Sequence, residues 1–430
     1  MSNQDTYLPI VEILENQTNI FKTNFQAVFS SSIDFPRFEF GFQHFYHADK
    51  GPKKTEFDLF KNKKKVYYVL NEYEREIDNY NDDIEHSCQA YFKNLTGDQI
   101  LTRSFHKYWE MFQYFDLINQ KKNISTLTIT NSLPSPTQAL IEYRKKIKQT
   151  SDQNDIYFIN NLENKLADDF IKKYKVDQLK KVDKKKYDLL IIDCGVKQEK
   201  NNQQEQVHVL ILLDVLQVII NNQVKGGNLI CKFYETYTIM SLKIIAILRE
   251  LYKTVHFVKP LMSRYTNAEK YLICTDFKDD KLTKEFDIIQ NLNHLIQKNK
   301  TNNITNIFKD FKFSDEFKMS IINTSNLVSN KQSEIINKMI TYVQTSNYHG
   351  DVYAESKEKQ IKAAGIWKEL FLKDNLIANK DTIKMVNEIV AEYNKKTEFF
   401  VKTANTKRYL IINANSTTEL TLTKPTETST

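Results

Sequence analysis

Glycine and proline are scarce in this chain, with 8 and 7 copies among 430 residues. The four cysteines include no Cys-x-x-Cys pair, so neither a zinc site of ordinary spacing nor a disulfide framework is expected. His44 and His47 stand close together without cysteines or an acidic cluster nearby, and no metal site is predicted there. No apolar stretch approaches the roughly 20 residues of a membrane helix, and no membrane association is expected.

The N-terminus is acidic and lacks the apolar core of a signal peptide. Three of the cysteines, Cys194, Cys231 and Cys274, lie in or beside apolar runs. Together these features predict reduced, buried thiols in an intracellular, reducing compartment, either the cytoplasm or the nucleus.

The charge balance is mildly basic, with 61 Lys and Arg against 54 Asp and Glu, a formal net charge of +7. This excess is compatible with a polyanionic partner such as RNA but does not require one. An ordinary solvated surface explains it equally well.

Changes in composition divide the chain into four regions. We predict an N-terminal accessory region at 1–95, a main domain at 96–285, a helical region at 286–414 and a disordered, Thr-rich tail at 415–430. Docking of a capping enzyme, a polymerase or another protein of a larger complex is one role open to the flanking regions.

Short β-branched runs alternate with helical periodicity through the main domain. Strands are predicted at 124–130, 156–159, 188–193, 226–234, 254–259 and 270–275, and helices at 101–118, 137–147, 207–220, 239–252 and 283–298. Further helices are predicted at 66–92, 331–345, 355–372 and 382–394. The alternation predicts an α/β fold with a doubly wound, largely parallel sheet, flanked by mostly helical extensions. The last two strands have a short link, which predicts that one of them is antiparallel.

Lys232 stands within an apolar strand that follows a Gly-Gly turn at Gly226 and Gly227. Burying an ammonium group costs several kcal/mol unless the group is paired or deprotonated. The position therefore indicates either a lysine held by buried carboxylates or one with a depressed pKa. A strand-end lysine whose amine reaches solvent is the structural alternative.

The segment from Lys225 to Cys274 contains, in order, the Gly-Gly turn, the strand with Lys232, a helix, Lys259-Pro260, and Ser263-Arg264 followed by Glu269 and Tyr271. In this order of features, residues 98–277 resemble the FtsJ-like (RrmJ-like) ribose 2′-O-methyltransferases, above all the forms of large DNA viruses and the cap ribose methyltransferases. The resemblance implies a Rossmann-like methyltransferase domain that uses S-adenosylmethionine on RNA, with mRNA caps as one candidate substrate. A viral factory in the cytoplasm is one setting that it suggests.

The resemblance also implies a Lys-Asp-Lys-Glu tetrad, matched here by Lys107, Asp193, Lys232 and Glu269. A ribose hydroxyl has a high pKa and needs a base or an orienting group, a role expected of Lys232. Lys107 is expected to lower the pKa of Lys232 by charge repulsion, while the two carboxylates fix the amine's direction and partly counter that shift. Structural alternatives are a surface lysine at 107, a turn cap at 193 and a salt-bridge partner at 269.

The cofactor loop departs from the family. The family's glycine-rich turn after the first strand corresponds here to residues 131–140, in which Ser135 and Pro136 replace two glycines. The cofactor contacts implied by position are Pro134, Ser135, Thr137, Asn160 and Asp193.

Two functions therefore stay open: an active RNA 2′-O-methyltransferase, and a pseudoenzyme kept as a structural or RNA-binding subunit. Arg264, Lys259 and Tyr234 are the candidate RNA contacts, the cations for phosphate and the ring for base stacking. Core or rim packing is the alternative for the ring. The sequence does not separate cap, ribosomal and transfer RNA substrates.

Overall fold

The computed structural model describes the main domain almost continuously and the flanking regions in part. The described residues are 10–14, 18–31, 99–115, 117–118, 123–148, 155–159, 165–174, 176–196, 204–236, 238–264, 267–278, 283–299, 301–325, 327–328, 367–368, 370–372, 409–411 and 421–423.

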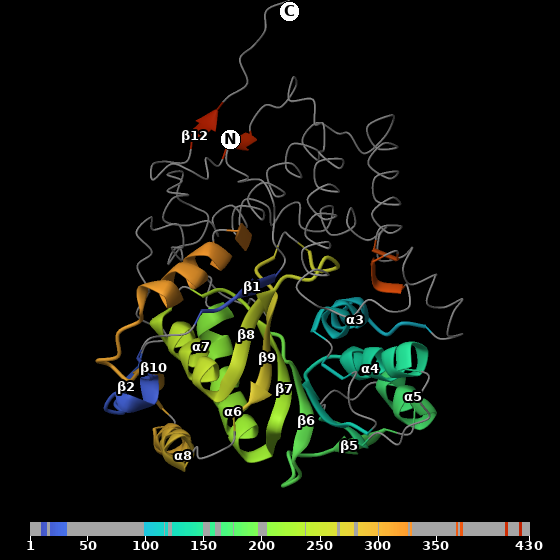
Figure 1. Ribbon diagram of the computed structural model, residues 1–430, viewed down its shortest axis with the longest axis horizontal. Coiled ribbons are helices and arrows are strands. Elements are labelled where there is room, and N and C mark those ends of the chain that lie inside the picture. Colours follow the sequence, from blue (N-terminus) through green and yellow to red (C-terminus); the bar gives the residue numbers. More distant parts are fainter. Residues whose placement is uncertain are drawn as a thin grey trace, which may run out of the picture.

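An eight-stranded sheet forms the centre of the described part, in the order β1-β8-β9-β7-β6-β3-β4-β5 (Figure 1). The strands are β1 (Ile10–Glu12), β3 (Ser125–Thr130), β4 (Asp155–Ile159), β5 (Asp177–Leu179), β6 (Tyr187–Asp193), β7 (Gln223–Phe233), β8 (Tyr252–Val258) and β9 (Lys270–Phe277). Strands β3 to β7 pair in parallel, whereas β9 runs antiparallel to both β7 and β8. The predicted α/β class and doubly wound sheet are confirmed, as is the prediction that one of the last two strands of the domain, here β9, is antiparallel.

Helices cover both faces of this sheet (Figure 1). On one side lie α3 (Ser104–Phe115), α4 (Ser135–Lys148) and α5 (Lys165–Tyr174), and on the other α6 (Gln204–Asn222), α7 (Ile239–Leu251) and α8 (Thr283–Lys298). Within β6, Leu189 and Ile191 belong to the core under α3 and α4, while Leu190 and Ile192 pack with α6 and α7. This alternation is the two-residue period of a strand that is buried on both faces.

The flanking regions contribute strands of their own. β1 extends the main sheet by pairing antiparallel with β8, and β2 (Ala27–Ser30) pairs with β10 (Asn303–Ile307). The 3-10 helix η1 (Ile20–Lys22) lies between β1 and β2 in the sequence, with Ile20 and Phe21 buried in the core of α6 and α7. The described N-terminal residues are thus joined to the main domain.

The predicted boundaries hold to within a few residues for the strands and helices of the main domain. The short strands β1, β2, β5 and β10 were not predicted. Near the C-terminus, β11 (Tyr409–Ile411) pairs antiparallel with β12 (Thr421–Thr423), which lies inside the predicted tail. The predicted helices at 66–92, 331–345 and 382–394 lie outside the described residues, and the one at 355–372 is described only near its end.

Cys194, Cys231 and Cys274 are free thiols, and Cys88 lies outside the described residues. Within the described ranges, no helix combines the length and the apolar character needed to cross a bilayer.

Candidate active site

Strand alternation directs three charged side chains to one face of the sheet. Asp193 ends β6 two residues after Ile191, and Lys232 on β7 follows Ile230 by two; both isoleucines belong to the core under α3. In the parallel pairing Ile192 lies opposite Cys231, which brings the ends of the two strands together. Asp193 and Lys232 therefore meet at the carboxyl edge of the sheet, where open α/β sheets bind their ligands.

Glu269 reaches the same face from the antiparallel strand. It immediately precedes β9, where Tyr271 lies opposite Lys232 in the register. Tyr271 and Ile273 face the core under α3, so Glu269, two residues before Tyr271, shares that face.

Helix α3 supplies the fourth charge. Its residues from Phe105 to Tyr114 are all buried, because the helix is packed on the sheet, on α4 and on further chain segments. Lys107 is only 6% exposed and cannot be the surface lysine that the sequence allowed as an alternative.

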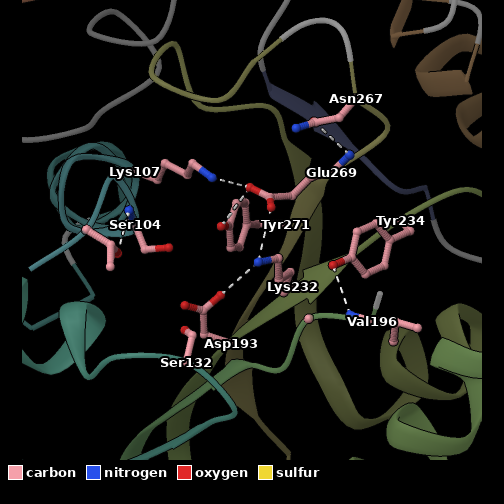
Figure 2. Close-up of polar contacts among 12 residues, drawn as sticks. Ser104, Lys107, Ser132, Asp193, Val196, Lys232, Tyr234, Asn267, Glu269 and Tyr271 are labelled. Atoms are coloured by element: carbon pink, nitrogen blue, oxygen red, sulfur yellow. Dashed lines mark hydrogen bonds and ion pairs between the residues drawn. The ribbon is translucent and has the colours of Figure 1, made fainter. Parts of the chain in front are cut away.

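The four predicted catalytic residues form one ion-pair network (Figure 2). Lys232 Nζ lies 3.3 Å from Asp193 Oδ1 and 3.1 Å from Glu269 Oε2, while Lys107 Nζ donates a hydrogen bond to Glu269 Oε1. Side-chain exposure in this cluster is 12% or less. Two lysines thus balance two carboxylates in a setting that excludes most solvent.

The network sets opposite pKa shifts on its members. Burial opposes ionisation of Glu269, but Lys107 and Lys232 outweigh it and hold the pKa of Glu269 well below its usual value. Burial lowers the pKa of Lys107, an effect that Glu269 only partly offsets. For Asp193 burial raises the pKa, and Lys232 opposes that rise.

Of the two possibilities left open for Lys232, the structure shows the lysine held by buried carboxylates, and the expected lowering of its pKa is wrong in direction. Burial alone would lower the pKa of Lys232, yet the Asp193 and Glu269 carboxylates together raise it well above the ordinary lysine value. The reason is geometric, because both carboxylates contact the amine directly, whereas Lys107 contacts Glu269. In this state Lys232 is an ammonium ion.

Further side chains hold Glu269 in place. The Tyr271 hydroxyl donates to Glu269 Oε1 at 3.1 Å, and the Glu269 N–H donates to Asn267 Oδ1 at 3.2 Å (Figure 2). Lys259 Nζ donates to the Glu269 carbonyl at 2.6 Å and to the Asn267 carbonyl and side-chain oxygens at 2.9 and 3.0 Å. Tyr271 belongs to the quoted motif, and its spacing from Glu269 by two residues is the signal that would have assigned it to the site.

Two of the three predicted RNA contacts have internal roles. Lys259 is 2% exposed and its three bonds fix the Asn267–Glu269 backbone, so the prediction that it binds phosphate is corrected. Tyr234 is 7% exposed, packs edge-on to His208 at 5.0 Å and accepts a 3.3 Å hydrogen bond from the Val196 N–H. Its ring is rim packing rather than an open stacking platform, whereas Arg264 is partly exposed.

The predicted cofactor loop leads directly into α4. The helix begins at Ser135, so Pro136 occupies its first turn, where a missing N–H breaks no helical bond. The Ser135 N–H donates to the Leu133 carbonyl at 2.7 Å, and its hydroxyl bonds that of Thr102. The Pro134 carbonyl accepts from the Gln138 N–H. Pro134 and Ser135 are thus engaged within the protein, and Asn160 lies outside the described residues.

A contact that the sequence did not reveal joins the loops after β3 and β6. Asn131 Nδ2 donates to the Gly195 carbonyl at 2.6 Å, and the Gly195 N–H donates to Asn131 Oδ1 at 2.8 Å. A Cβ at Gly195 would lie 3.9 Å from Lys232 Nζ, so this contact adjoins the ion-pair network. A polar residue directly after a buried strand is the signal that could have indicated it.

No group of three or more His, Cys, Asp and Glu side chains arranged to hold a metal ion occurs in the described part of the chain. His44 and His47 lie outside that part.

Comparison with known proteins identifies a family for the main domain. Residues 100–277 match the family described as FtsJ-like methyltransferase, which confirms the resemblance that the motifs carried.

Individual relatives are distant. A cap-specific mRNA (nucleoside-2′-O-)-methyltransferase 1 of Dictyostelium discoideum is 23% identical over 182 residues, covering 42% of this chain and 24% of that protein. An uncharacterized protein of Acanthamoeba polyphaga mimivirus is 23% identical over 300 residues, which cover 69% of this chain and 74% of the relative. The chain spans about a quarter of the length of the Dictyostelium relative. A crystal structure of a putative ribosomal RNA methyltransferase from Plasmodium falciparum covers 41% of this chain and 97% of its own, with 20% identity and a TM-score of 0.30.

Proposed function

We propose that this chain, whose residues 100–277 match the FtsJ-like methyltransferases, transfers a methyl group from S-adenosylmethionine to a ribose 2′-hydroxyl of RNA. The observation that carries the proposal is the convergence of Lys107, Asp193, Lys232 and Glu269 on one sheet edge. The names of curated relatives make an mRNA cap the first substrate to test.

Buried polar groups at this edge fit S-adenosylmethionine, the cofactor that the family match implies. Asp193 Oδ2 and the Thr137 hydroxyl have no hydrogen-bond partner within the described residues, although both side chains are buried, and Asp193 Oδ1 forms only its ion pair with Lys232. Such unsatisfied groups are expected where a ligand supplies the missing partners. Asp193 and Thr137, with the joined Asn131 and Gly195, are the residues that would hold it, and when bound it supplies an electrophilic methyl group.

Lys232 is the group that would act on the ribose. As an ammonium it can donate a hydrogen bond to the hydroxyl oxygen, and Asp193 and Glu269 fix the direction of that donor. To accept the hydroxyl proton, Lys232 must first release its own. Repulsion by Lys107 favours that release, while the two carboxylates oppose it.

Substitutions at Lys232 separate these roles. Lys232→Ala removes the amine, and Lys232→Arg keeps a cation and donors but cannot lose its proton at ordinary pH. We expect both to reduce single-turnover methyl transfer to capped RNA by about 100-fold or more, the scale of general acid–base catalysis. Lys225→Ala, at an exposed lysine of the same strand, is the matched control and should keep wild-type activity.

Calorimetry with S-adenosylmethionine distinguishes the active enzyme from the alternative, an inactive methyltransferase fold that serves as a subunit of a larger complex. The alternative has its own support, because Ser135 and Pro136 offer no free backbone donor at the start of α4. Binding heat together with Lys232-dependent transfer supports the enzyme. Absence of heat at millimolar cofactor, with no transfer to capped or uncapped RNA, would leave only the subunit.

A further inference from the structure

Both tryptophans of the chain lie at one contact between α3 and a segment near the C-terminus. Trp109 Nε1 on α3 donates to the Phe371 carbonyl at 2.8 Å, and Trp367 Nε1 donates to Glu110 Oε1 on α3 at 2.7 Å. We call Trp367, Leu370 and Phe371 the C-terminal anchor. Figure 1 shows this segment, coloured orange-red, next to α3.

The C-terminal anchor is part of the core beneath the candidate active site. Its three side chains are at most 2% exposed and belong to the same apolar cluster as Phe105, Tyr108 and Phe112 of α3. The ring of Trp367 also stands edge-on to His106, with centroids 5.4 Å apart. Apolar burial on this scale contributes about 1.5–3 kcal/mol per large side chain, enough to keep the segment on α3.

Glu110 joins this anchor to the loop that leads to Glu269. Its Oε2 accepts the Leu261 N–H at 2.6 Å, and its Oε1 accepts the Met262 N–H at 2.9 Å in addition to the Trp367 indole. The side chain is fully buried. An ionised carboxylate in such a place needs several donors, and these three come from two separate segments.

The position of Glu110 makes this contact relevant to the site. Glu110 lies three residues after Lys107 on α3, and the Leu261–Met262 turn begins the loop that ends at Glu269. Lys107 and Glu269, which hydrogen-bond each other, are thus held a second time through Glu110. Removing one of its three donors would leave the buried Glu110 carboxylate only partly hydrogen-bonded, which is energetically unfavourable.

We propose that the C-terminal anchor positions the candidate active site: Trp367 holds Glu110, Glu110 holds the Leu261–Met262 turn, and the turn sets Glu269 against Lys107. The catalytic part of this inference rests on the proposed methyltransferase function. Glu110 and Trp367 are positioning residues that act through the turn.

A matched pair of tryptophan variants tests the inference in the full chain. Trp367→Phe and Trp109→Phe each remove one indole donor from the same interface and keep an aromatic ring, but only the first bond ends on Glu110. Hydrogen–deuterium exchange of the peptides that cover 259–270 reports the turn without any need for enzymatic activity.

We expect exchange at Leu261 and Met262 to rise about tenfold in Trp367→Phe, the effect of one lost charge-assisted bond, and to stay at the wild-type rate in Trp109→Phe. In the methyl-transfer assay, kcat should fall by a similar factor in Trp367→Phe with the KM for the cofactor unchanged. If Trp367→Phe does not fold, Glu110→Gln provides the same comparison, because it keeps the volume and loses one acceptor.

Equal exchange at the turn in both tryptophan variants would mean that the Trp367–Glu110 hydrogen bond has no specific effect on the turn, and it would overturn the inference. So would unchanged exchange in both Trp367→Phe and Glu110→Gln. A wild-type protein without methyl transfer but with the expected exchange pattern would contradict the proposed function and still support the positioning.

Discussion

At the scale of single residues, buried charges dominate this protein. Lys107, Asp193 and Glu269 are nearly inaccessible to solvent, and Lys232 is only slightly more exposed. Buried ion pairs add little net stability, because the cost of removing charge from water offsets their attraction. A role in the proposed reaction therefore explains these buried charges better than a contribution to stability does. In this arrangement Lys232 is a charged donor whose direction is set by two carboxylates.

Ionisation of the buried Glu110 should lower the free energy of unfolding, so the stability of the protein should depend on pH. Burial raises its pKa to about 7, against the hydrogen bonds from Trp367, Met262 and Leu261 that lower it. Because the pKa is raised in the folded protein, the stabilising contribution is present below the unfolded pKa and is lost as pH rises through the folded value. The free energy of unfolding, relative to Glu110→Gln, should therefore fall by about 3 kcal/mol between pH 4.5 and pH 8.

Urea unfolding of both proteins across this range checks the prediction. The glutamine side chain does not titrate, so its own stability curve supplies the reference for all other groups. Parallel curves for the two proteins would show that Glu110 titrates at an ordinary pKa.

At the scale of elements, β7 shows how the sheet accommodates its Gly-Gly turn. The partners of β6 jump from Gln223 opposite Tyr187 to Asn228 opposite Leu189, which marks an irregularity in the pairing. Gly226 has a φ of 69°, a conformation that favours glycine. Gln223 Nε2 donates to the carbonyls of Tyr187 and Asp188 and so replaces part of the missing ladder.

Gly227 is the position in this irregularity with the least space. A Cβ there would lie 2.2 Å from Gln223 Nε2, 2.8 Å from the Val224 carbonyl and 3.0 Å from the Asp188 carbonyl. Because two of these atoms are backbone, Gly227→Ala should destabilise the fold by about 1–3 kcal/mol, as overpacking does. Thermal unfolding measures this loss.

Gly195→Ala is the control for that substitution. A Cβ at Gly195 meets its neighbours at 3.5 Å or more, which is ordinary contact. A melting temperature equally low in both variants would contradict the steric explanation.

The strands and helices also show how much of the fold the sequence could predict. Periodicity placed the long strands and helices because each is buried on a face of regular spacing. The three-residue strands β1 and β5 were missed because so short a segment has no period, and β1 pairs with β8 across more than 240 positions of sequence. Convergence of Asp193 and Lys232 was predicted from the family resemblance, and in the structure the parallel pairing of β6 and β7 accounts for it.

Other features of the site depend on contacts that leave no local pattern. Glu110 and Trp367 are 257 positions apart, and neither stands in a motif. Lys259 was predicted to bind phosphate because its place in the sequence gives no sign of its three internal hydrogen-bond acceptors. The pKa of Lys232 was predicted in the wrong direction because its sign depends on which neighbour touches the amine.

At the scale of the whole molecule, the positive charge is less available than the composition indicates. Lys107, Lys243, Lys259 and Lys270 are buried and donate to oxygens inside the protein. If the chain binds RNA as proposed, its phosphate contacts would come from cations that are at least partly exposed, and Arg264 is the predicted one near the site. A modest number of phosphate contacts is expected from a net charge of +7.

The salt dependence of RNA binding tests whether exposed cations contact phosphate while the buried lysines do not. For single-stranded RNA the slope of log K against log salt changes by about 0.7 per phosphate contact. Arg264→Ala should make the slope shallower by about that amount, while Lys232→Ala should leave it unchanged, because Lys232 faces two carboxylates rather than open solvent. A shallower slope in Lys232→Ala would mean that Lys232 contacts phosphate, and its role as the group that acts on the ribose hydroxyl would have to be abandoned.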